Sequence, residues 1–242
     1  MVPAGTWRRL GPSQVTAAFA LKRGMTLLDE AQPDDPATLA WWLVDVDVLV
    51  LGRGSNVAAD AGGVSVARRS SGGGPVLWGP DLLALDVVVP KAHPLYSDDV
   101  ADSYRWLGQA LARAITKVGV PAQAITPTEA RCADNAAGAL ACFASLSPWE
   151  VVIDGRKVVG LSQVRRRTGT LLQAGVLINI DGDRLAGLLD LDPASRRALA
   201  TTLTERATGV ADHVDVDRKT IIEAVSTAIT DAAEHCGRRA HV

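Results

Sequence analysis

The dipeptide Asp154-Gly155 places the strongest local constraint on the fold of this chain. It separates two apolar-rich runs, "WEVVI" before it and "RKVVG" after it. Aspartate and glycine both tolerate a positive φ, so this pair is typical of a two-residue hairpin turn. Residues 149–160 are therefore predicted to form two antiparallel strands.

Other segments extend this hairpin into a mixed fold. A second hairpin is predicted over residues 161–181, with its turn near Thr168-Gly169. Short β-branched runs predict further strands, and apolar residues at helical spacing predict helices. Because the strands cluster between helices without regular alternation, the sequence predicts an α+β fold, a mixed β-sheet layered with helices. The further strands are predicted at residues 46–52, 64–69 and 82–90, and the helices at 15–30, 97–118 (with Ser97 as N-cap), 183–190, 193–203 and 217–236.

Composition limits the classes of partner. The chain has 242 residues, 48% of them hydrophobic, which is enough for a single domain over residues 1–242. A formal net charge of -2 provides no overall field for nucleic acid or an anionic membrane. No apolar run has the length of a membrane span or the form of a signal peptide. The cysteines are odd in number and lack zinc-site spacing, so we expect free thiols, no metal site and a cytoplasmic protein without nucleic-acid or membrane partners.

The glycine-rich segment "ARRSSGGGPVLWG", residues 67–79, follows a predicted strand. It lacks the lysine of a P-loop, and it leads into another strand, whereas a dinucleotide fingerprint opens a helix. Two interpretations remain open from these residues alone. The glycines can turn backbone N–H groups toward an anion or carbonyl beside Arg68 and Arg69. The segment can equally be a tight turn with solvated arginines.

Three segments occur in the order that is typical of one family. "RRSSGGGPVL" resembles the Arg-Arg-x-Ser/Thr-Gly-Gly signature of the lipoate-protein ligase A and octanoyltransferase family, which shares its fold with biotin-protein ligases. "DGRKVVGLSQ" resembles the hairpin that carries an essential lysine in this family, and "ACFASLSPWE" resembles the Cys-Phe segment of its cysteine-using octanoyltransferases. The resemblance covers residues 47–181, before a helical region at 182–242, and implies a biotin/lipoate-protein-ligase-like catalytic domain.

The resemblance implies an enzyme that attaches a lipoyl or octanoyl group to a lysine of a lipoyl domain or a glycine-cleavage H protein. The first expectation is ATP-dependent ligation through an acyl-adenylate, with ATP and Mg²⁺ as cofactors and lipoate or octanoate as substrate. The alternative is an octanoyltransferase without a cofactor, which takes octanoyl from acyl carrier protein as a thioester on Cys142. A non-catalytic acyl or nucleotide binder with the same fold is the third alternative.

Lys157 and Cys142 are the candidate catalytic residues. The resemblance implies that Lys157 directs its ammonium toward the charge that develops on the acyl carbonyl oxygen. From the residues alone, Lys157 can also be an exposed hairpin lysine, and Cys142 a small buried hydrophobe. The candidate substrate-binding residues are Arg68, Arg69, Ser71, Gly72, Gly73, Gly74, Gly160, Ser162 and Gln163.

The chain departs from the family pattern at two histidine positions. Trp78-Gly79 stands where many members have His-Asp, and Gln173-Ala174-Gly175 stands where many have Gln-His-Gly. No histidine is therefore positioned by motif as a general base, and Trp78-Gly79 is the expected origin of altered substrate choice. The helical region after residue 182 is also too short for the accessory domain of many ligases, so a ligase of this kind would need that domain from a separate protein.

Overall fold

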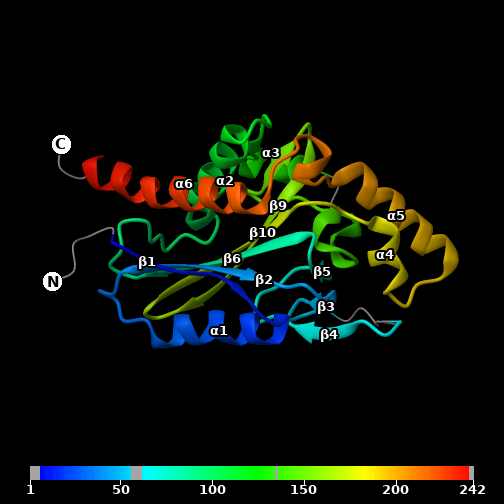
Figure 1. Ribbon diagram of the computed structural model, residues 1–242, viewed down its shortest axis with the longest axis horizontal. Coiled ribbons are helices and arrows are strands. Elements are labelled where there is room, and N and C mark those ends of the chain that lie inside the picture. Colours follow the sequence, from blue (N-terminus) through cyan, green and yellow to red (C-terminus); the bar gives the residue numbers. More distant parts are fainter. Residues whose placement is uncertain (1–5, 56–61, 134–135, 240–242) are drawn as a thin grey trace.

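A seven-stranded sheet forms the centre of the protein in the computed structural model (Figure 1). The structure describes residues 6–55, 62–133 and 136–239, with side chains up to residue 233. Strands β1 and β2 are parallel, and every other neighbouring pair in this sheet is antiparallel. In spatial order the strands are β1 (Trp7–Gln14), β2 (Ala37–Leu43), β6 (Leu82–Pro90), β10 (Gly169–Leu177), β9 (Arg156–Arg166), β8 (Val151–Ile153) and β7 (Gln123–Ala124).

A smaller three-stranded sheet carries the glycine-rich segment. Its order is β4 (Ser65–Arg68), β3 (Val48–Leu51) and β5 (Val76–Trp78). The central strand β3 is parallel to β4 and antiparallel to β5. Residues 69–75 thus join the two outer strands of this sheet, so they are a loop between non-neighbouring strands and not a hairpin turn.

Helices cover both faces of the central sheet. In Figure 1, α2 and α6 lie above the sheet and α1 lies below it, while α4 and α5 extend beyond one end. The α-helices are α1 (Ala17–Glu30), α2 (Arg105–Lys117), α3 (Pro127–Cys132), α4 (Gly182–Gly187), α5 (Pro193–Arg206) and α6 (Arg218–Arg239), and the short 3-10 turns are η1 (Asp102–Tyr104), η2 (Ala136–Ala139), η3 (Cys142–Ala144) and η4 (Val210–Asp212).

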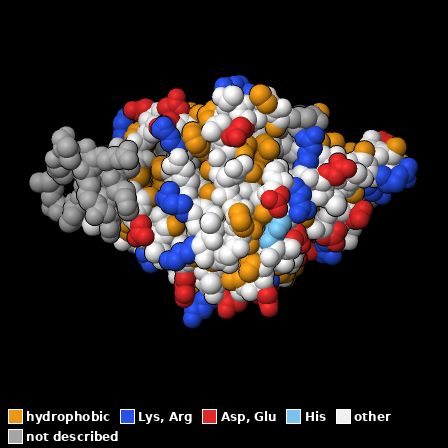
Figure 2. All heavy atoms as spheres, turned by 90° about the horizontal axis from the view of Figure 1, so that it is seen from above, with side chains coloured by type: hydrophobic (Ala, Val, Ile, Leu, Met, Phe, Trp, Pro, Cys, Tyr) orange, Lys and Arg blue, Asp and Glu red, His pale blue; other side chains and the backbone are white. Residues whose placement is uncertain are grey.

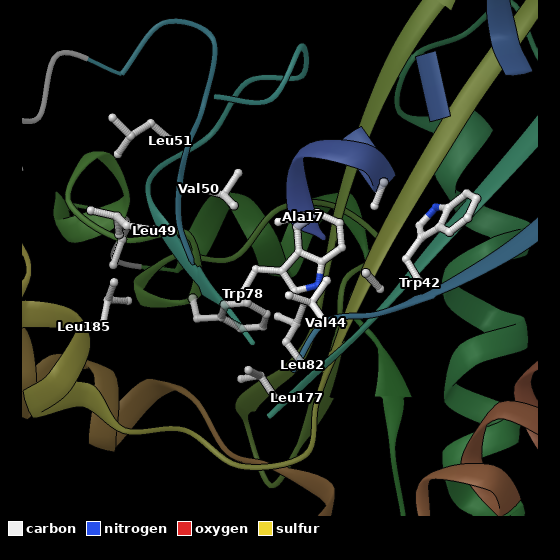
Figure 3. Close-up of a cluster of buried hydrophobic side chains, with 14 of the residues drawn as sticks. Ala17, Trp42, Val44, Leu49, Val50, Leu51, Trp78, Leu82, Leu177 and Leu185 are labelled. Carbon is white, nitrogen blue, oxygen red and sulfur yellow. The ribbon is translucent and has the colours of Figure 1, made fainter. Parts of the chain in front are cut away.

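Two hydrophobic clusters lie on opposite faces of the sheet, because side chains alternate along each strand. The first, which we call the helix-face cluster, joins Leu83 and Val87 of β6 to residues of α2 and α6. The second, which we call the cavity-face cluster, joins Leu82 and Val88 of β6 to α1, α4, α5 and the smaller sheet. Figure 3 shows part of this second cluster, with Trp78 among neighbouring apolar side chains.

The surface agrees with the small net charge. In Figure 2, which looks onto the face above α2 and α6, Lys and Arg side chains are interspersed with Asp and Glu. Within the described residues, no helix combines the length and apolarity needed to cross a bilayer.

The predicted hairpin and the α+β class are both confirmed. Asp154 and Gly155 have φ values of 48° and 77°, and they connect β8 to β9 as the sequence indicated. Strand β10 follows β9 after a short turn at residues 167–168, close to the predicted position.

The predicted start of the second long helix was wrong. Ser97 caps no helix, because its hydroxyl accepts the N–H of Asp99 and donates to Asp102. Asp99 then accepts the N–H of Asp102 at 2.6 Å, which starts the short turn η1, and α2 begins only at Arg105. The competing local bonds of Ser and Asp side chains explain the delay. Strands β1 and β2 were not predicted at all.

Candidate active site

A cavity of about 300 Å³ lies between the central sheet, the smaller sheet and η3. It brings together segments that are far apart in the sequence, namely residues 69–74, 142–150 and 157–163. Most of the residues predicted to form a site line it. These are Arg69, Gly72, Gly73, Gly74, Cys142, Lys157, Gly160, Ser162 and Gln163.

Arg69 holds the glycine-rich segment in shape. Its guanidinium donates to the carbonyl oxygens of Gly72 (2.8 and 3.1 Å) and Gly74 (2.9 Å), and only 8% of the residue is exposed. The pKa of Arg69 is lowered by burial. The charge of the nearby Cys142 sulfur acts on the pKa of Arg69 in the opposite direction. The interpretation as a turn with solvated arginines is therefore wrong for Arg69.

Glycine is required in this loop for two different reasons. Gly73 has a φ of 97°, a region that side-chain-bearing residues rarely adopt. A Cβ at Gly73 would also lie 2.8 Å from Nη2 of Arg69 and 4.0 Å from Sγ of Cys142. At Gly74, an added Cβ would overlap the carbonyl oxygen of Gly138 and the backbone of Ala141.

Two predicted residues act from outside the cavity wall. Arg68 donates to the carbonyl oxygens of Gly52 (2.7 Å) and Ser55 (3.0 Å), so its charge ties down the preceding loop and does not face the cavity. Ser71 is 2% exposed and lies behind the wall, where it accepts the hydroxyl hydrogen of Ser162 at 3.0 Å. The prediction that Arg68 faces a bound ligand was therefore wrong for this structure.

Lys157 is a buried lysine with a complete set of partners, and is not an exposed hairpin residue. Its ammonium lies 2.7 Å from Oε1 of Glu150 and donates to the carbonyl oxygens of Cys142 (2.9 Å) and Ser145 (3.1 Å). Only 2% of each side chain of the ion pair is exposed. These three acceptors match the three donors of an ammonium, so Lys157 binds the segment that carries Cys142.

Glu150 is equally well partnered. Besides Lys157, it accepts the N–H of Leu161 on Oε1 (3.1 Å) and the N–H of Ser147 on Oε2 (2.7 Å). Through these bonds the pair ties the start of β8 and the middle of β9 to η3 and to the loop that joins η3 to β8. A buried ion pair of this kind holds its geometry because each charge has hydrogen bonds in addition to its partner.

The backbone of Cys142 is held on both sides. Its N–H donates to the carbonyl oxygen of Pro75 at 2.8 Å, and its carbonyl oxygen accepts from Lys157. Pro75 thus connects the glycine-rich segment to the cysteine. Cys142 is a free, partly exposed thiol at the cavity wall.

A row of polar side chains forms one border of the cavity floor. Ser162 donates to Ser71, Ser71 donates to Oε1 of Gln173 (3.1 Å), and Nε2 of Gln173 donates to Oδ1 of Asp86 (2.9 Å). Nε1 of Trp42 donates to the other oxygen of Asp86 at 2.8 Å. Burial raises the pKa of Asp86 to about 6, although the bonds from Gln173 and Trp42 act in the opposite direction.

Helix α1 approaches this carboxylate closely. A Cβ at Gly24 would overlap Oδ2 of Asp86, so the glycine inside the predicted first helix allows the helix to pack on β6. The cost of a glycine inside a helix is therefore offset by the close packing of α1 on β6.

Trp78 ends strand β5, which follows the glycine-rich segment. Its side chain lines the cavity and packs in the cavity-face cluster, near Val44 and Leu82 (Figure 3). Its indole N–H is buried and has no hydrogen-bond partner among the described residues. Gly79 beside it lies against Asp47, whose carboxylate would overlap any added Cβ.

Gln163 lies at the outer edge of the cavity. Its amide donates to the carbonyl oxygen of Val100 (2.9 Å) and to Ser103 (3.2 Å), which fixes the loop before η1 against β9. Tyr104 lines the same edge, and burial raises its pKa to about 12.

Two residues of the site were missed from the sequence. Asp86 is the one acid in the apolar run "LLALDVVV", and a lone carboxylate in a buried strand signals a polar partner. Glu150 precedes the predicted hairpin turn by four residues, so the hairpin register alone places it near the residues that follow Lys157. Among the described residues, no group of three His, Cys, Asp or Glu side chains could hold a metal ion.

Comparison with known proteins shows the family of the chain. The model of the lipoyl protein ligase A/B catalytic domain matches residues 16–232. The chain belongs to this family. It is therefore an enzyme of acyl transfer, as the three sequence segments indicated.

Similar curated proteins are octanoyltransferases. The chain is 31% identical over 240 residues to octanoyltransferase LipM of Kyrpidia tusciae, covering 94% of this chain and 87% of the relative. It is 27% identical over 219 residues to octanoyltransferase LipM of Moorella thermoacetica, covering 86% of this chain and 79% of the relative. These names correspond to the alternative expectation from the sequence, not to the ATP-dependent ligase that was placed first.

Solved structures of lipoate ligases share the fold of this family member. A bi-partite lipoate protein ligase from Thermoplasma acidophilum, studied with its E2 lipoyl domain, superimposes with a TM-score of 0.77 at 21% identity and covers 95% of this chain and 84% of that one. A lipoate-protein ligase A bound with ATP gives a TM-score of 0.71 at 21% identity over 93% of this chain and 85% of that one. The fold predicted from the sequence is thereby confirmed.

Proposed function

We propose that the protein is an octanoyltransferase that carries the acyl group as a thioester on Cys142. The donor is an octanoyl acyl carrier protein, and the acceptor is a lysine of a lipoyl domain or an H protein. The observation that carries this proposal is a free thiol at the wall of a largely apolar cavity, with its backbone fixed from both sides. The names of the curated relatives support the same reaction.

The reaction takes place in two balanced steps. The Cys142 thiolate attacks the carbonyl carbon of the carrier thioester, the carrier sulfur leaves, and that sulfur takes up a proton. The neutral amine of the acceptor lysine then attacks the same carbonyl carbon, the bond to Cys142 breaks, and the proton lost by the amine goes to the departing thiolate. No oxidant, nucleotide or metal is needed in either step.

The residues around Cys142 divide these tasks among them. Lys157 fixes the carbonyl of Cys142, and Arg69 supplies a buried positive charge next to the thiol. Because Arg69 holds the carbonyl oxygens of Gly72 and Gly74, N–H groups of the same loop are the donors we assign to the acyl oxyanion. Removal of one such donor typically raises a barrier by about 3 kcal/mol.

The cationic side chains of the site fit ATP poorly. Arg68 and Arg69 both donate to backbone carbonyls of their own loops, and Lys157 is saturated by Glu150 and two carbonyl oxygens. A triphosphate needs free donors, because each phosphate oxygen seeks charge-assisted hydrogen bonds. The described donors of the site are therefore already taken, and the ATP-dependent ligase is the second candidate, supported by the motifs of the sequence. The accessory protein that such a ligase would need is not required for the transferase.

A thiolate nucleophile also agrees with the compartment expected from the sequence. Free cysteines persist in reducing compartments, so the reaction is assigned to the cytoplasm.

Intact mass spectrometry tests the proposal. Wild-type protein incubated with octanoyl acyl carrier protein should gain one octanoyl group, and Cys142→Ala should gain none. Lys157→Met serves as a second variant that keeps the thiol. An adduct that forms equally on Cys142→Ala, or lipoate-dependent exchange of pyrophosphate into ATP without any adduct, would contradict the transferase.

A further inference from the structure

The floor of the cavity contains a row of positions with almost no side chain. In the registers of the central sheet, Gly160 of β9 lies opposite Gly175 of β10, and Gly175 lies opposite Ala84 of β6. Residues directly opposite in antiparallel strands point to the same face, so these three form one line across the sheet. All three line the cavity.

Side chains border this row on both sides. On one side lies the polar row of Ser162, Gln173 and Asp86, in which each of these residues bonds to a neighbour. On the other side lies Leu82, whose Cδ1 would be 3.2 Å from a Cβ added at Gly175. The result is a trough with one apolar border and one polar border whose hydrogen bonds are already made. Such a trough suits a methylene chain, because the chain offers no hydrogen bonds of its own.

The trough begins at the reacting residues. A Cβ at Gly160 would lie 3.3 Å from Cε of Lys157 and 3.4 Å from Cζ of Phe143, the neighbour of Cys142 in η3. Cys142 lines the same cavity as Gly160, so an acyl group bonded to its sulfur can enter the trough at Gly160 and extend across β10 toward β6.

The other end of the row is closed by a large side chain. Trp42 of β2 lies opposite Ala84 and is the next residue in the same line. It is 4% exposed, and its indole is fixed by the hydrogen bond to Asp86 and by an edge contact with Phe19, with ring centroids 6.2 Å apart. The cavity reaches Ala84 and Asp86 but not Trp42. From Gly160 to Ala84 the row spans two interstrand spacings, or about 10 Å, which is the extended length of a medium-length acyl chain.

We infer that Ala84, backed by Trp42, is the specificity-determining position that limits the acyl chain to medium length. This inference rests on the proposed function, since it takes the chain to be bonded to Cys142. It assigns Asp86 the task of holding Trp42 and Gln173 in place, and it explains why the smallest side chains of the floor are aligned across three strands.

A chain-length series tests the inference. Carrier proteins loaded with butanoyl, hexanoyl, octanoyl, decanoyl or dodecanoyl groups are offered to the wild type and to Ala84→Val and Ala84→Leu, and the rate of adduct formation is followed by intact mass. Wild type should prefer octanoyl over dodecanoyl. Ala84→Leu should lose about tenfold or more of its octanoyl rate, because overpacking opposes the longer chain, and should keep its butanoyl rate. The octanoyl rate of Ala84→Val should lie between those of the wild type and Ala84→Leu.

Matched variants separate chain length from stability. Ala186→Val changes a fully buried alanine of α4 in the cavity-face cluster that does not line the cavity, and it should leave the profile unchanged. Trp42→Leu should move the profile in the opposite direction, toward decanoyl and dodecanoyl. Circular dichroism identifies any variant that fails to fold, and the milder Ala84→Val then decides. A wild-type preference that is the same for all variants overturns the inference.

The failure of the proposed function would look different. If the wild type forms no adduct with any chain, the thioester mechanism fails, and binding of the free fatty acids of the same lengths is measured by calorimetry. An optimum that becomes shorter in Ala84→Leu supports the trough, and an unchanged optimum or no binding overturns it.

Discussion

On the helix face of the central sheet, Leu83 and Val87 of β6 are almost fully buried among large apolar side chains, and neither lines the cavity. On the cavity face of the same strand, Ala84 and Asp86 take the corresponding positions. Each face follows the twofold alternation of a strand, but only the cavity face gives up side-chain volume. A ligand site can thus be formed by small side chains on one face of a sheet while the other face stabilises the sheet.

The cavity face also concentrates buried charge. Asp86, Glu150 and Lys157 are each below 5% exposed, and all three line the cavity. Their hydrogen bonds fix the position of Cys142 and the border of the trough. Replacing these groups therefore tests whether the two faces differ in function as well as in composition.

The largest effect on stability is expected from Glu150→Ala. This change leaves the Lys157 ammonium buried without a counter-charge, which typically costs about 3–5 kcal/mol. Urea unfolding measures the loss. The double variant with Lys157→Met should recover part of it, since the unpaired charge is then gone, and a loss below about 1 kcal/mol for Glu150→Ala would show that the pair does not hold the site.

A pair of leucine variants compares the faces directly. Leu83→Ala on the helix face should lower the free energy of unfolding by about 2–5 kcal/mol and leave the acyl chain-length profile unchanged. Leu82→Ala on the cavity face should cost less stability, because it opens into existing space, and should change the profile. Thermal and urea unfolding with the adduct assay check both, and equal profiles in the two variants would remove the distinction between the faces.

Asp86→Asn should change how stability depends on pH. The pKa of Asp86 is raised to about 6 in the folded protein, so its favourable contribution is complete below the unfolded pKa near 4 and is lost as pH rises to 6. The free energy of unfolding of Asp86→Asn, relative to that of the wild type, should therefore rise by roughly 2–3 kcal/mol between pH 4 and pH 7. Urea unfolding across this range measures it. The exposed Asp34→Asn is the control, and parallel curves for Asp86→Asn and wild type would contradict the raised pKa.

The smallest effect is expected from Gly73→Ala. The positive φ of Gly73 makes this change cost about 1 kcal/mol in stability. The added Cβ also disturbs Arg69 and lies near Cys142, so the rate of adduct formation should fall by more than the stability loss alone explains. Adduct formation quenched at several times gives the rate. An unchanged rate would show that the shape of the loop does not affect the reactivity of the Cys142 thiol.

The sequence predicted the parts of the molecule that depend on local rules. The turn at Asp154-Gly155 follows from the conformations that these two residues allow, and the order of the glycine-rich segment, Cys142 and Lys157 indicated the family. The two carbonyl partners of Lys157, on Cys142 and Ser145, could not be predicted, because they belong to a loop whose path depends on tertiary packing. The trough was hidden for the same reason, since Gly160, Gly175 and Ala84 become neighbours only through the strand register.

The helix at residues 97–118 shows where local rules conflict. Ser97 has the chemistry of an N-cap, but its hydroxyl bonds to Asp99 and Asp102, and the carboxylate of Asp99 accepts the N–H of Asp102 at the start of η1, so α2 begins later than predicted. Arg68 and Arg69 also could not be told apart by local rules. At the end of β4, Arg68 donates to Gly52 in the preceding loop, whereas Arg69 donates to Gly72 in the glycine-rich segment.

The most direct test of the account follows the acyl group itself. Wild-type protein is loaded with octanoyl acyl carrier protein, freed of the carrier, and mixed with a lipoyl-domain protein in the absence of ATP, and both proteins are weighed over time. We expect the octanoyl group to disappear from the peptide containing Cys142 and to appear on a lysine of the acceptor at the same rate. An octanoyl group that stays on the enzyme, or that reaches the acceptor only when ATP is added, would contradict it.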